Sequence, residues 1–382
     1  MVLQVTNLND SGPDSLRAAI DASGPRTIVF TVSGIIQLAS PLNLTQPFCT
    51  ISGQSAPGGG ILLTGIPGGN ANLLRIHAND VVVRYLRLRD VVSGAVGGMG
   101  QSPIGIVDCQ NVMVDHCSWS WGLDDAQAWQ SVVSPDTKNI TIQWCLAAEG
   151  LEGHSTGLLI GGLGNYDVTP PDETYLKVRD ISVHHNLFVH NYDRNPRVRS
   201  GGCQVINNVV YNWGSRVGVV EMGSNVDFIN NYWKPGPMRQ NAAVVYKYEG
   251  RSQAGVLYPI PSLYMAGNIV PGSFEDPGAN NQSLITFNST PGYPGFGPLP
   301  ASYFTSTPLP QALYPITIET ATAAYNSVLA WAGANARLTS DGIWIANPDS
   351  VDQRVLADVQ NGTGWSWPVA SPEAAGGFPT IG

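Results

Sequence analysis

Charged side chains are scarce in this 382-residue chain: lysine, arginine, aspartate and glutamate make up 12% of it, well below the usual quarter. The formal net charge is −9 and no basic stripe is present, so we expect no nucleic-acid partner. No apolar run reaches the length of a membrane-spanning helix, so we expect no membrane partner either. The opening residues MVLQVTNLND lack the positively charged and then apolar regions of a secretory signal peptide. If the natural protein is exported, we expect that its signal peptide has been removed.

Cysteines are few and scattered. Their number is odd and their spacings are not those of a zinc site. We therefore expect small, buried, free thiols at Cys49, Cys109, Cys117, Cys145 and Cys203.

Glycine (43) and proline (28) are plentiful, which indicates an all-β protein with short strands and many turns. Seven segments share one pattern: alternating apolar residues, a short polar break, and a second apolar run. Their starts lie roughly 22 to 41 residues apart, the spacing of one solenoid coil per repeat with loops of varying length. The segments begin at Asp80, Asn111, Asn139, Asp180, Cys203, Asn225 and Ser262.

The polar break carries a second signal. Asparagine precedes the second apolar run in four repeats and cysteine in two, at Asn186, Asn208, Asn231, Asn268, Cys117 and Cys145. Stacked coils would bring these residues to the strand spacing of ~4.8 Å, where amides hydrogen-bond along the column. The pattern predicts a right-handed parallel β-helix rather than a sandwich.

Covers are expected at both ends of such a solenoid. Helical spacing of apolar residues predicts an N-terminal capping helix within residues 14–24 and further helices within residues 319–334 and 349–364. We therefore predict a β-helix catalytic domain over residues 1–300, and a C-terminal extension over residues 301–382 that packs on it without being an independent domain.

The segment RNPRVR, residues 194–199, concentrates three arginines in an acidic chain. Pro196 favours an extended backbone before it, and in an extended chain Arg197 and Arg199 project to the same side. Guanidinium groups held in this way suit a planar anion such as a carboxylate.

Several motifs, in their order, resemble the bacterial pectate lyases of polysaccharide lyase family 1: DSGPDSLRAAI, TISGQSAPGGGILL, DHCSWSWGLDDAQAW, ITIQWCLAAEG, GHSTGLLIGG, ISVHHNLFVHN and RNPRVR. The resemblance implies a parallel β-helix and Ca²⁺-assisted β-elimination of 4-linked galacturonate, which yields 4,5-unsaturated oligogalacturonides. It also implies a secreted protein whose partner is an acidic polysaccharide, and we expect a monomer.

The resemblance also assigns roles to residues. The R-x-P-x-x-R motif of the family makes Arg194 the base that removes the proton, with Arg199 binding the substrate carboxylate and Arg197 beside it. The acidic Ca²⁺ motifs fall on Asp124 and Asp125 in GLDDA and on Glu149 in AAEG.

Other residues near these motifs also bear on the site. Many members of the wider family have a substrate-binding lysine after the second acidic motif, and here His154 takes its place. Glu152 either adds a metal ligand or is plain surface, and we favour surface. Tryptophans in strands pack in the core more often than they form platforms for sugar rings. We therefore expect core packing of Trp119, Trp121, Trp129 and Trp144.

The chemistry explains this set of residues. Removing the proton from C5 of a uronate builds negative charge beside a carboxylate, so cations must neutralise that carboxylate. In a solenoid we expect Asp124, Glu149 and Arg194 to line one groove, one coil apart. A guanidinium acts as a base only if its pKa is depressed, so we expect an alkaline optimum.

Two other classes of function remain open. An inverting polygalacturonase would use two carboxylates that flank the bond with room for water, and GLDDA and GHS loosely echo its motifs. A β-helix adhesin or carbohydrate-binding protein would bind sugar without turnover. A lyase for another acidic polysaccharide, or a Ca²⁺-independent lyase for methylated pectin, is a further alternative.

Overall fold

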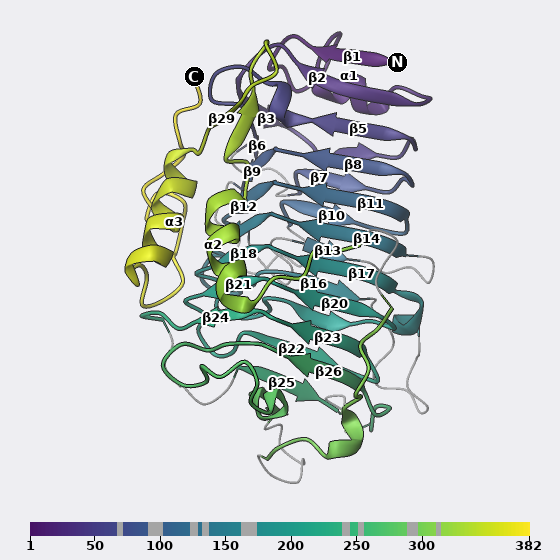
Figure 1. Cartoon of the computed structure of the whole chain (residues 1–382). Helices are drawn as coiled ribbons and strands as arrows, with labels where there is room; N and C mark the ends of the chain where they lie inside the picture. Colours follow the sequence, from purple (N-terminus) through teal and green to yellow (C-terminus); the bar gives the residue numbers. More distant parts are fainter. Residues whose placement is uncertain are drawn as a thin grey trace.

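The computed structural model describes residues 1–66, 72–90, 102–122, 129–131, 137–161, 174–238, 245–250, 256–288, 297–310 and 315–382. These residues wind into a parallel β-helix with three long sheets (Figure 1). Each coil adds one strand to each sheet in turn, and parallel crossovers of this kind are right-handed. The predicted fold class is confirmed.

The strands of each sheet follow one another along the solenoid. The first sheet contains β1 (Val2–Val5), β2 (Arg26–Phe30), β5 (Cys49–Ser52), β8 (Val81–Arg84), β11 (Gln110–Asp115), β14 (Lys138–Gln143), β17 (Arg179–His184), β20 (Cys203–Ile206), β23 (Asn225–Ile229) and β26 (Ser262–Ala266). The second contains β3 (Gly34–Leu38), β6 (Ile61–Gly65), β9 (Arg87–Arg89), β12 (Ser118–Ser120), β15 (Leu146–Ala148), β18 (Leu187–Val189), β21 (Val209–Tyr211) and β24 (Tyr232–Lys234). The third contains β4 (Leu42–Leu44), β7 (Leu74–Ile76), β10 (Ile104–Ile106), β13 (Trp129–Ser131), β16 (Leu159–Gly161), β19 (Arg197–Arg199), β22 (Gly218–Glu221), β25 (Tyr246–Glu249) and β27 (Ile285–Phe287).

Helices and one hairpin complete the chain. They are α1 (Leu16–Asp21), α2 (Ala321–Trp331), α3 (Ser350–Asn361), the antiparallel pair β28 (Ala336–Leu338) and β29 (Trp344–Ala346), and the short 3₁₀ turns η1 (Gly53–Ser55), η2 (Thr174–Lys177), η3 (Asn281–Leu284) and η4 (Ala301–Tyr303). All three predicted helices are present. Within the described residues, no helix is long and apolar enough to cross a bilayer.

The repeats coincide with the coils. Each predicted repeat supplies one strand to the first sheet and, after the polar break, continues towards the second. Val112, Ile140 and Ile181 occupy matching positions on β11, β14 and β17, and all three are buried. The alternation read from the sequence therefore fills the interior of the solenoid with stacked β-branched side chains.

The asparagine column is present and longer than predicted. The side-chain amide of Asn186 donates to Asn208 (3.0 Å), Asn208 to Asn231 (3.1 Å), and Asn231 to Asn268 (2.8 Å). Asn268 then donates to Asn281 (2.8 Å), which ends the column. Each amide is satisfied along the stack, so these buried polar groups do not carry the desolvation cost of unpaired ones.

The thiols also behave as expected. The five cysteines are buried and free. The backbone N–H of Cys145 donates to the Asn186 side chain (2.9 Å), so this cysteine stands where the asparagine column would otherwise continue.

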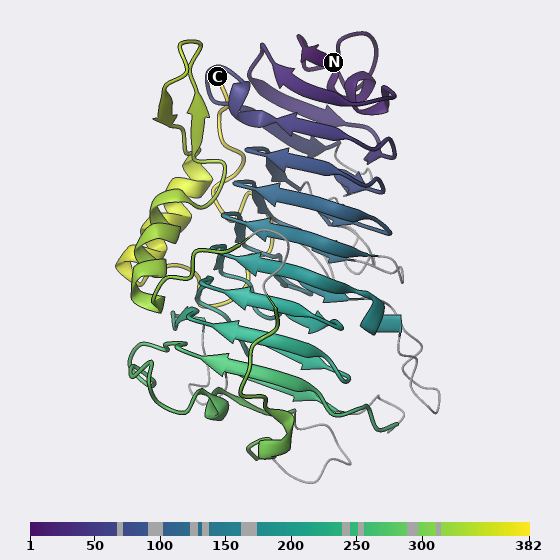
Figure 2. The ribbon, with the colours of Figure 1, turned by 45° about the vertical axis from the view of Figure 1, so that its right-hand side comes forward.

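The ends and one side of the solenoid are covered. Helix α1 lies over the N-terminal coil, and its first turn is capped by Ser15, whose hydroxyl accepts from the N–H of Ala18 (3.2 Å). Helices α2 and α3 lie along the second sheet (Figure 2). Val328 of α2 and Val355 of α3 pack with Leu187 in a separate apolar cluster, so the extension is joined to the solenoid by a hydrophobic layer.

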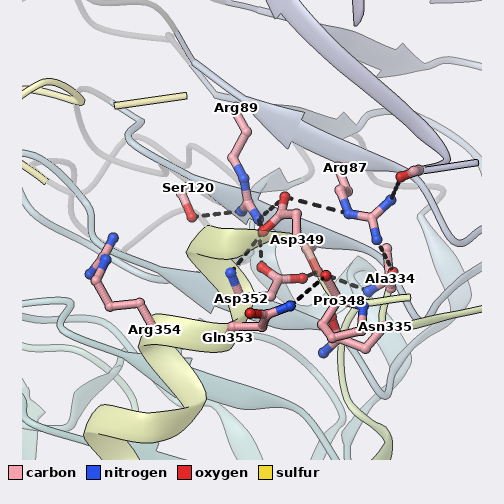
Figure 3. A network of polar contacts seen from close by, with 12 residues as sticks. Arg87, Arg89, Ser120, Ala334, Asn335, Pro348, Asp349, Asp352, Gln353 and Arg354 are labelled. Carbon is pink, nitrogen blue, oxygen red and sulfur yellow. Dashed lines mark hydrogen bonds and ion pairs between the residues drawn. The ribbon is translucent and has the colours of Figure 1, made fainter. Parts of the chain in front are cut away.

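A buried charge network anchors α3 (Figure 3). The Arg89 guanidinium donates to Asp349 (3.0 Å) and Asp352 (2.5 Å), and the Asp352 carboxylate accepts from the Ser118 hydroxyl (2.6 Å). Burial alone would lower the pKa of Arg89, but the two aspartates together raise it. Arg87 donates to the carbonyl oxygen of Ala334 (2.6 Å), so two arginines of β9 hold segments from the C-terminal part of the chain.

We predict that Asp352→Asn destabilises the protein by about 3 kcal/mol or more, because it leaves Arg89 buried with incomplete charge compensation. Urea unfolding monitored by circular dichroism measures this. Asp180→Asn is the matched control: its ion pair with Arg179 (2.6 Å) is about half exposed, so a change within about 0.5 kcal/mol is expected. Equal effects of the two substitutions would contradict the structural role of the network.

Candidate active site

A cavity of about 420 Å³ lies where two successive coils turn from the second sheet to the third. One wall comes from residues 152–156, between β15 and β16, and another from residues 192–194, between β18 and β19. Trp367 and Pro368 of the C-terminal extension complete the lining. Pockets of this size with a few convergent polar groups are typical of small-molecule or sugar sites.

The two turns are hydrogen-bonded to each other. The N–H of Gly157 donates to the carbonyl oxygen of Asp193 (3.1 Å), and the N–H of Leu158 donates to that of Arg194 (2.7 Å). A Cβ on Gly157 would lie 2.4 Å from the side-chain oxygen of Asn195, so only glycine permits this approach. Arg194 has φ of 61°, a left-handed conformation that Glu149 (57°) also adopts where the preceding coil turns.

Arg194 lies in a strongly cationic environment. Burial lowers its pKa to about 9, with further lowering from Arg197, Arg199 and Arg216, while Glu221 opposes the shift. The depressed pKa that a guanidine base requires is therefore a property of this position.

Arg197 and Arg199 project to the same side of β19, as predicted. Arg197 donates through Nε (2.8 Å) and Nη2 to the Glu221 carboxylate, and Arg199 Nε donates to the same carboxylate. Burial would raise the pKa of Glu221, but the two arginines hold it well below its usual range. The carboxylate that binds these two arginines in the structure is thus Glu221, on the next coil.

A second carboxylate follows one coil later. Glu249 pairs in register with Glu221 and accepts from the Asn288 amide (2.7 Å). Burial and the neighbouring Glu221 raise the pKa of Glu249 to about 7. On the pocket side, Arg216 donates to Asp193 (2.9 Å) and fixes that carboxylate beside Arg194.

Glu149 does not lie in the pocket. Its side chain is 0% exposed, and its carboxylate accepts from Arg354 of α3 (2.5 and 2.9 Å) and from the indole N–H groups of Trp121 (3.0 Å) and Trp365 (2.6 Å). Burial would raise the pKa of Glu149, but Arg354 lowers it. The expectation that Glu149 shares one groove with Arg194 is wrong, because its carboxylate is buried against Arg354 and two indole N–H groups and does not line the cavity.

The other proposed metal ligands need separate mention. Asp124 and Asp125 lie outside the described residues. Across the described ranges, no group of three or more His, Cys, Asp or Glu side chains is placed to hold a metal ion. Glu152, expected to be plain surface, lines the pocket and is exposed, so it is the carboxylate of its turn that faces the cavity.

The remaining candidates fall into two groups. His154 lines the pocket. Trp119 and Trp121 are buried, and Trp144 stacks between the rings of His116 (5.9 Å) and His185 (4.4 Å), as expected of structural aromatics. The side chain of Trp129 lies outside the part that the structure describes.

Sequence reasoning missed several residues of this region. Glu221 and Glu249 end successive strands of the third sheet, so aligning the segments GVVE and YKYE would have revealed them. Asp193 and Arg216 lie outside the repeated strand pattern, so the repeats do not point to them. Trp367 comes from outside the solenoid, and no periodic pattern points to it.

Comparisons with known proteins agree with this architecture. The family model for pectate lyase matches residues 59–254. "Probable pectate lyase C" of Aspergillus flavus is 38% identical over 240 residues, 62% of this chain and 50% of that protein. The "pectate trisaccharide-lyase" of Thermotoga maritima is 28% identical over 116 residues, 30% of this chain and 28% of that protein. The chain spans about half the length of the Aspergillus relative. Because this relative is fungal, the expected resemblance to bacterial pectate lyases in particular is not supported.

Solved structures share the fold. A pectate lyase bound to a hexasaccharide has a TM-score of 0.61 at 15% identity, covering 87% of this chain and 92% of that one. Jun a 1, the major allergen from cedar pollen, has a TM-score of 0.58 at 17% identity, covering 87% of this chain and 88% of that one. With the family model matching half of its length, the chain belongs to the pectate lyase family.

Proposed function

We propose that this chain is a secreted, monomeric pectate lyase that cleaves 4-linked galacturonan by β-elimination, with Arg194 as the base. One observation carries the proposal: Arg194, with its pKa lowered to about 9, lines a cavity beside His154 in a chain of this family. An acidic polysaccharide suits a cavity lined by Arg194, whose electrostatic neighbours include Arg197, Arg199 and Arg216.

The proposed reaction needs little from the protein beyond charge and position. The neutral guanidine of Arg194 takes the proton from C5 of a galacturonate residue. The electron pair left on C5 forms the C4–C5 double bond, and the C4–O bond to the leaving sugar breaks. The leaving oxygen receives a proton from solvent water and Arg194 returns its proton to solvent, so the products are an unsaturated uronide and a shortened chain. His154 contacts the bound sugar from the opposite turn.

Arg197 and Arg199 stay as the proposed partners of the substrate carboxylate. Glu221 accepts from the Nε atoms of both and also from Nη2 of Arg197. Glu221 holds the two forks in a fixed orientation, which lowers the entropy lost when a planar carboxylate binds.

Calcium is the proposed cofactor, as the family resemblance implies. Asp124 and Asp125 would hold it together with Glu152, the exposed carboxylate of the pocket, in place of Glu149. Bound calcium would neutralise the uronate carboxylate whose charge opposes loss of the C5 proton.

An inverting hydrolase is less well supported. It needs two carboxylates about 6.5–9.5 Å apart, with room for a water between them. Glu221 and Glu249 have pKa values pushed in opposite directions, but they are hydrogen-bonded to each other in neighbouring strands, which leaves no room for a sugar.

The first test is the pH profile with polygalacturonate, followed by the ultraviolet absorbance of unsaturated products. Only the neutral guanidine accepts a proton, so kcat/KM should rise with pH through about 9, the free-enzyme pKa of Arg194. Arg194→Lys should lower kcat by about a hundredfold or more, whereas Arg179→Lys, at an exposed site, should change it little. Full activity at pH 5 would rule out Arg194 as the base.

Calcium dependence gives a second test. Chelator should abolish activity on polygalacturonate, and added Ca²⁺ should restore it. Glu152→Gln should weaken Ca²⁺ binding on the order of tenfold, measured by calorimetry. Glu149→Gln should leave Ca²⁺ affinity unchanged and lower stability instead, because it weakens the buried pair with Arg354. The reverse outcome would return Glu149 to the ligand set.

A further inference from the structure

The C-terminal extension reaches the pocket and is fixed there. The Tyr211 hydroxyl donates to the carbonyl oxygen of Thr363 (2.6 Å), and the Asn212 amide donates to that of Trp365 (2.8 Å). The N–H of Glu152 donates to the carbonyl oxygen of Val369 (2.8 Å). The segment 363–369 is therefore tied to the solenoid on both sides of Trp367, which makes its position a fixed part of the site.

The two tryptophans of this segment have different environments. Trp365 packs against the apolar cluster under α3 and donates to the buried Glu149, so it anchors the segment. Trp367 is 47% exposed, lines the cavity and contacts the Tyr192 ring edge-on at 5.3 Å. Its indole N–H donates to Glu152 (3.0 Å), which fixes the orientation of the ring.

The pocket therefore presents two kinds of surface. Arg194 and His154 supply polar and cationic groups, while Trp367 and Tyr192 supply an aromatic surface on the same cavity. A pyranose ring has the complementary arrangement: hydroxyl and carboxylate groups at its edge, and an apolar face of C–H bonds. Large aromatic side chains with a polar tip suit such a ligand, because they offer contact area and lose little rotamer freedom.

We propose that Trp367, supported by Tyr192, is a sugar-stacking subsite that positions a uronate ring beside Arg194. The inference rests on the proposed function and deepens it, since it assigns substrate binding to a residue outside the 59–254 segment that the family model matches. Trp367 acts on affinity and on the length of chain that is bound. It takes no part in the proton transfer.

Kinetics on polygalacturonate test this assignment. Trp367→Ala should raise KM about tenfold, the loss expected when one aromatic contact is removed, with kcat and the pH profile unchanged. Trp367→Phe keeps the ring and loses the N–H, so it should restore most of the affinity. Trp331→Ala is the control, because Trp331 on α2 is 60% exposed and does not line the cavity.

Binding is measured separately from turnover. Calorimetry with trigalacturonate compares Arg194→Lys with the double variant Arg194→Lys/Trp367→Ala, and about tenfold weaker binding by the double variant is expected. Unchanged binding and KM would overturn the subsite while leaving the lyase function intact. If the wild type released no unsaturated product, the lyase function would fail, and the binding comparison would still decide the subsite. Absence of any binding by the wild type would overturn both.

Discussion

In-register stacking of the coils is the constraint on which the rest of the structure depends. Parallel strands place matching residues of successive repeats at the strand spacing of about 4.8 Å. This brings the asparagine amides together and fills the interior with apolar columns. It also brings the turn that carries His154 against the turn that carries Arg194, through the pairing of Thr156 with Asp193. The part of the site that carries His154 and Arg194 is therefore built from neighbouring coils, and the C-terminal extension adds Trp367 and Pro368.

The parts of the molecule that repeat could be predicted from the sequence. Strand alternation, the asparagine column and the free cysteines all express a local pattern that each coil repeats, so several segments support the same conclusion. The shared direction of Arg197 and Arg199 also followed from strand geometry. The direction of the two arginines used only the rule that residues two apart in a strand lie on one face. The asparagine column also used the stacking of the coils, and the free cysteines their number and spacing.

The turns could not be predicted in the same way. Glu149 comes directly after β15 with φ of 57°, so strand parity no longer determines where its side chain points. Its partner Arg354 belongs to the C-terminal extension, and the choice between metal and guanidinium depends on where that helix packs. Glu152, three residues later, faces the pocket for the same reason: the turn re-aims the chain. Trp367 could not be predicted because its position depends on tertiary contacts alone.

The charge balance around Arg194 explains why this arginine differs from its neighbours. Glu221 is shared by Arg197 and Arg199, and Asp193 is held by Arg216. Burial destabilises the charged form of Arg194, and the positive charges of Arg197, Arg199 and Arg216 add to this effect. Glu249 is ionised above about pH 7 and adds a compensating charge beside Arg197 and Arg216. In the alkaline range where Arg194 loses its proton, the surrounding arginines therefore keep both their charge and their positions.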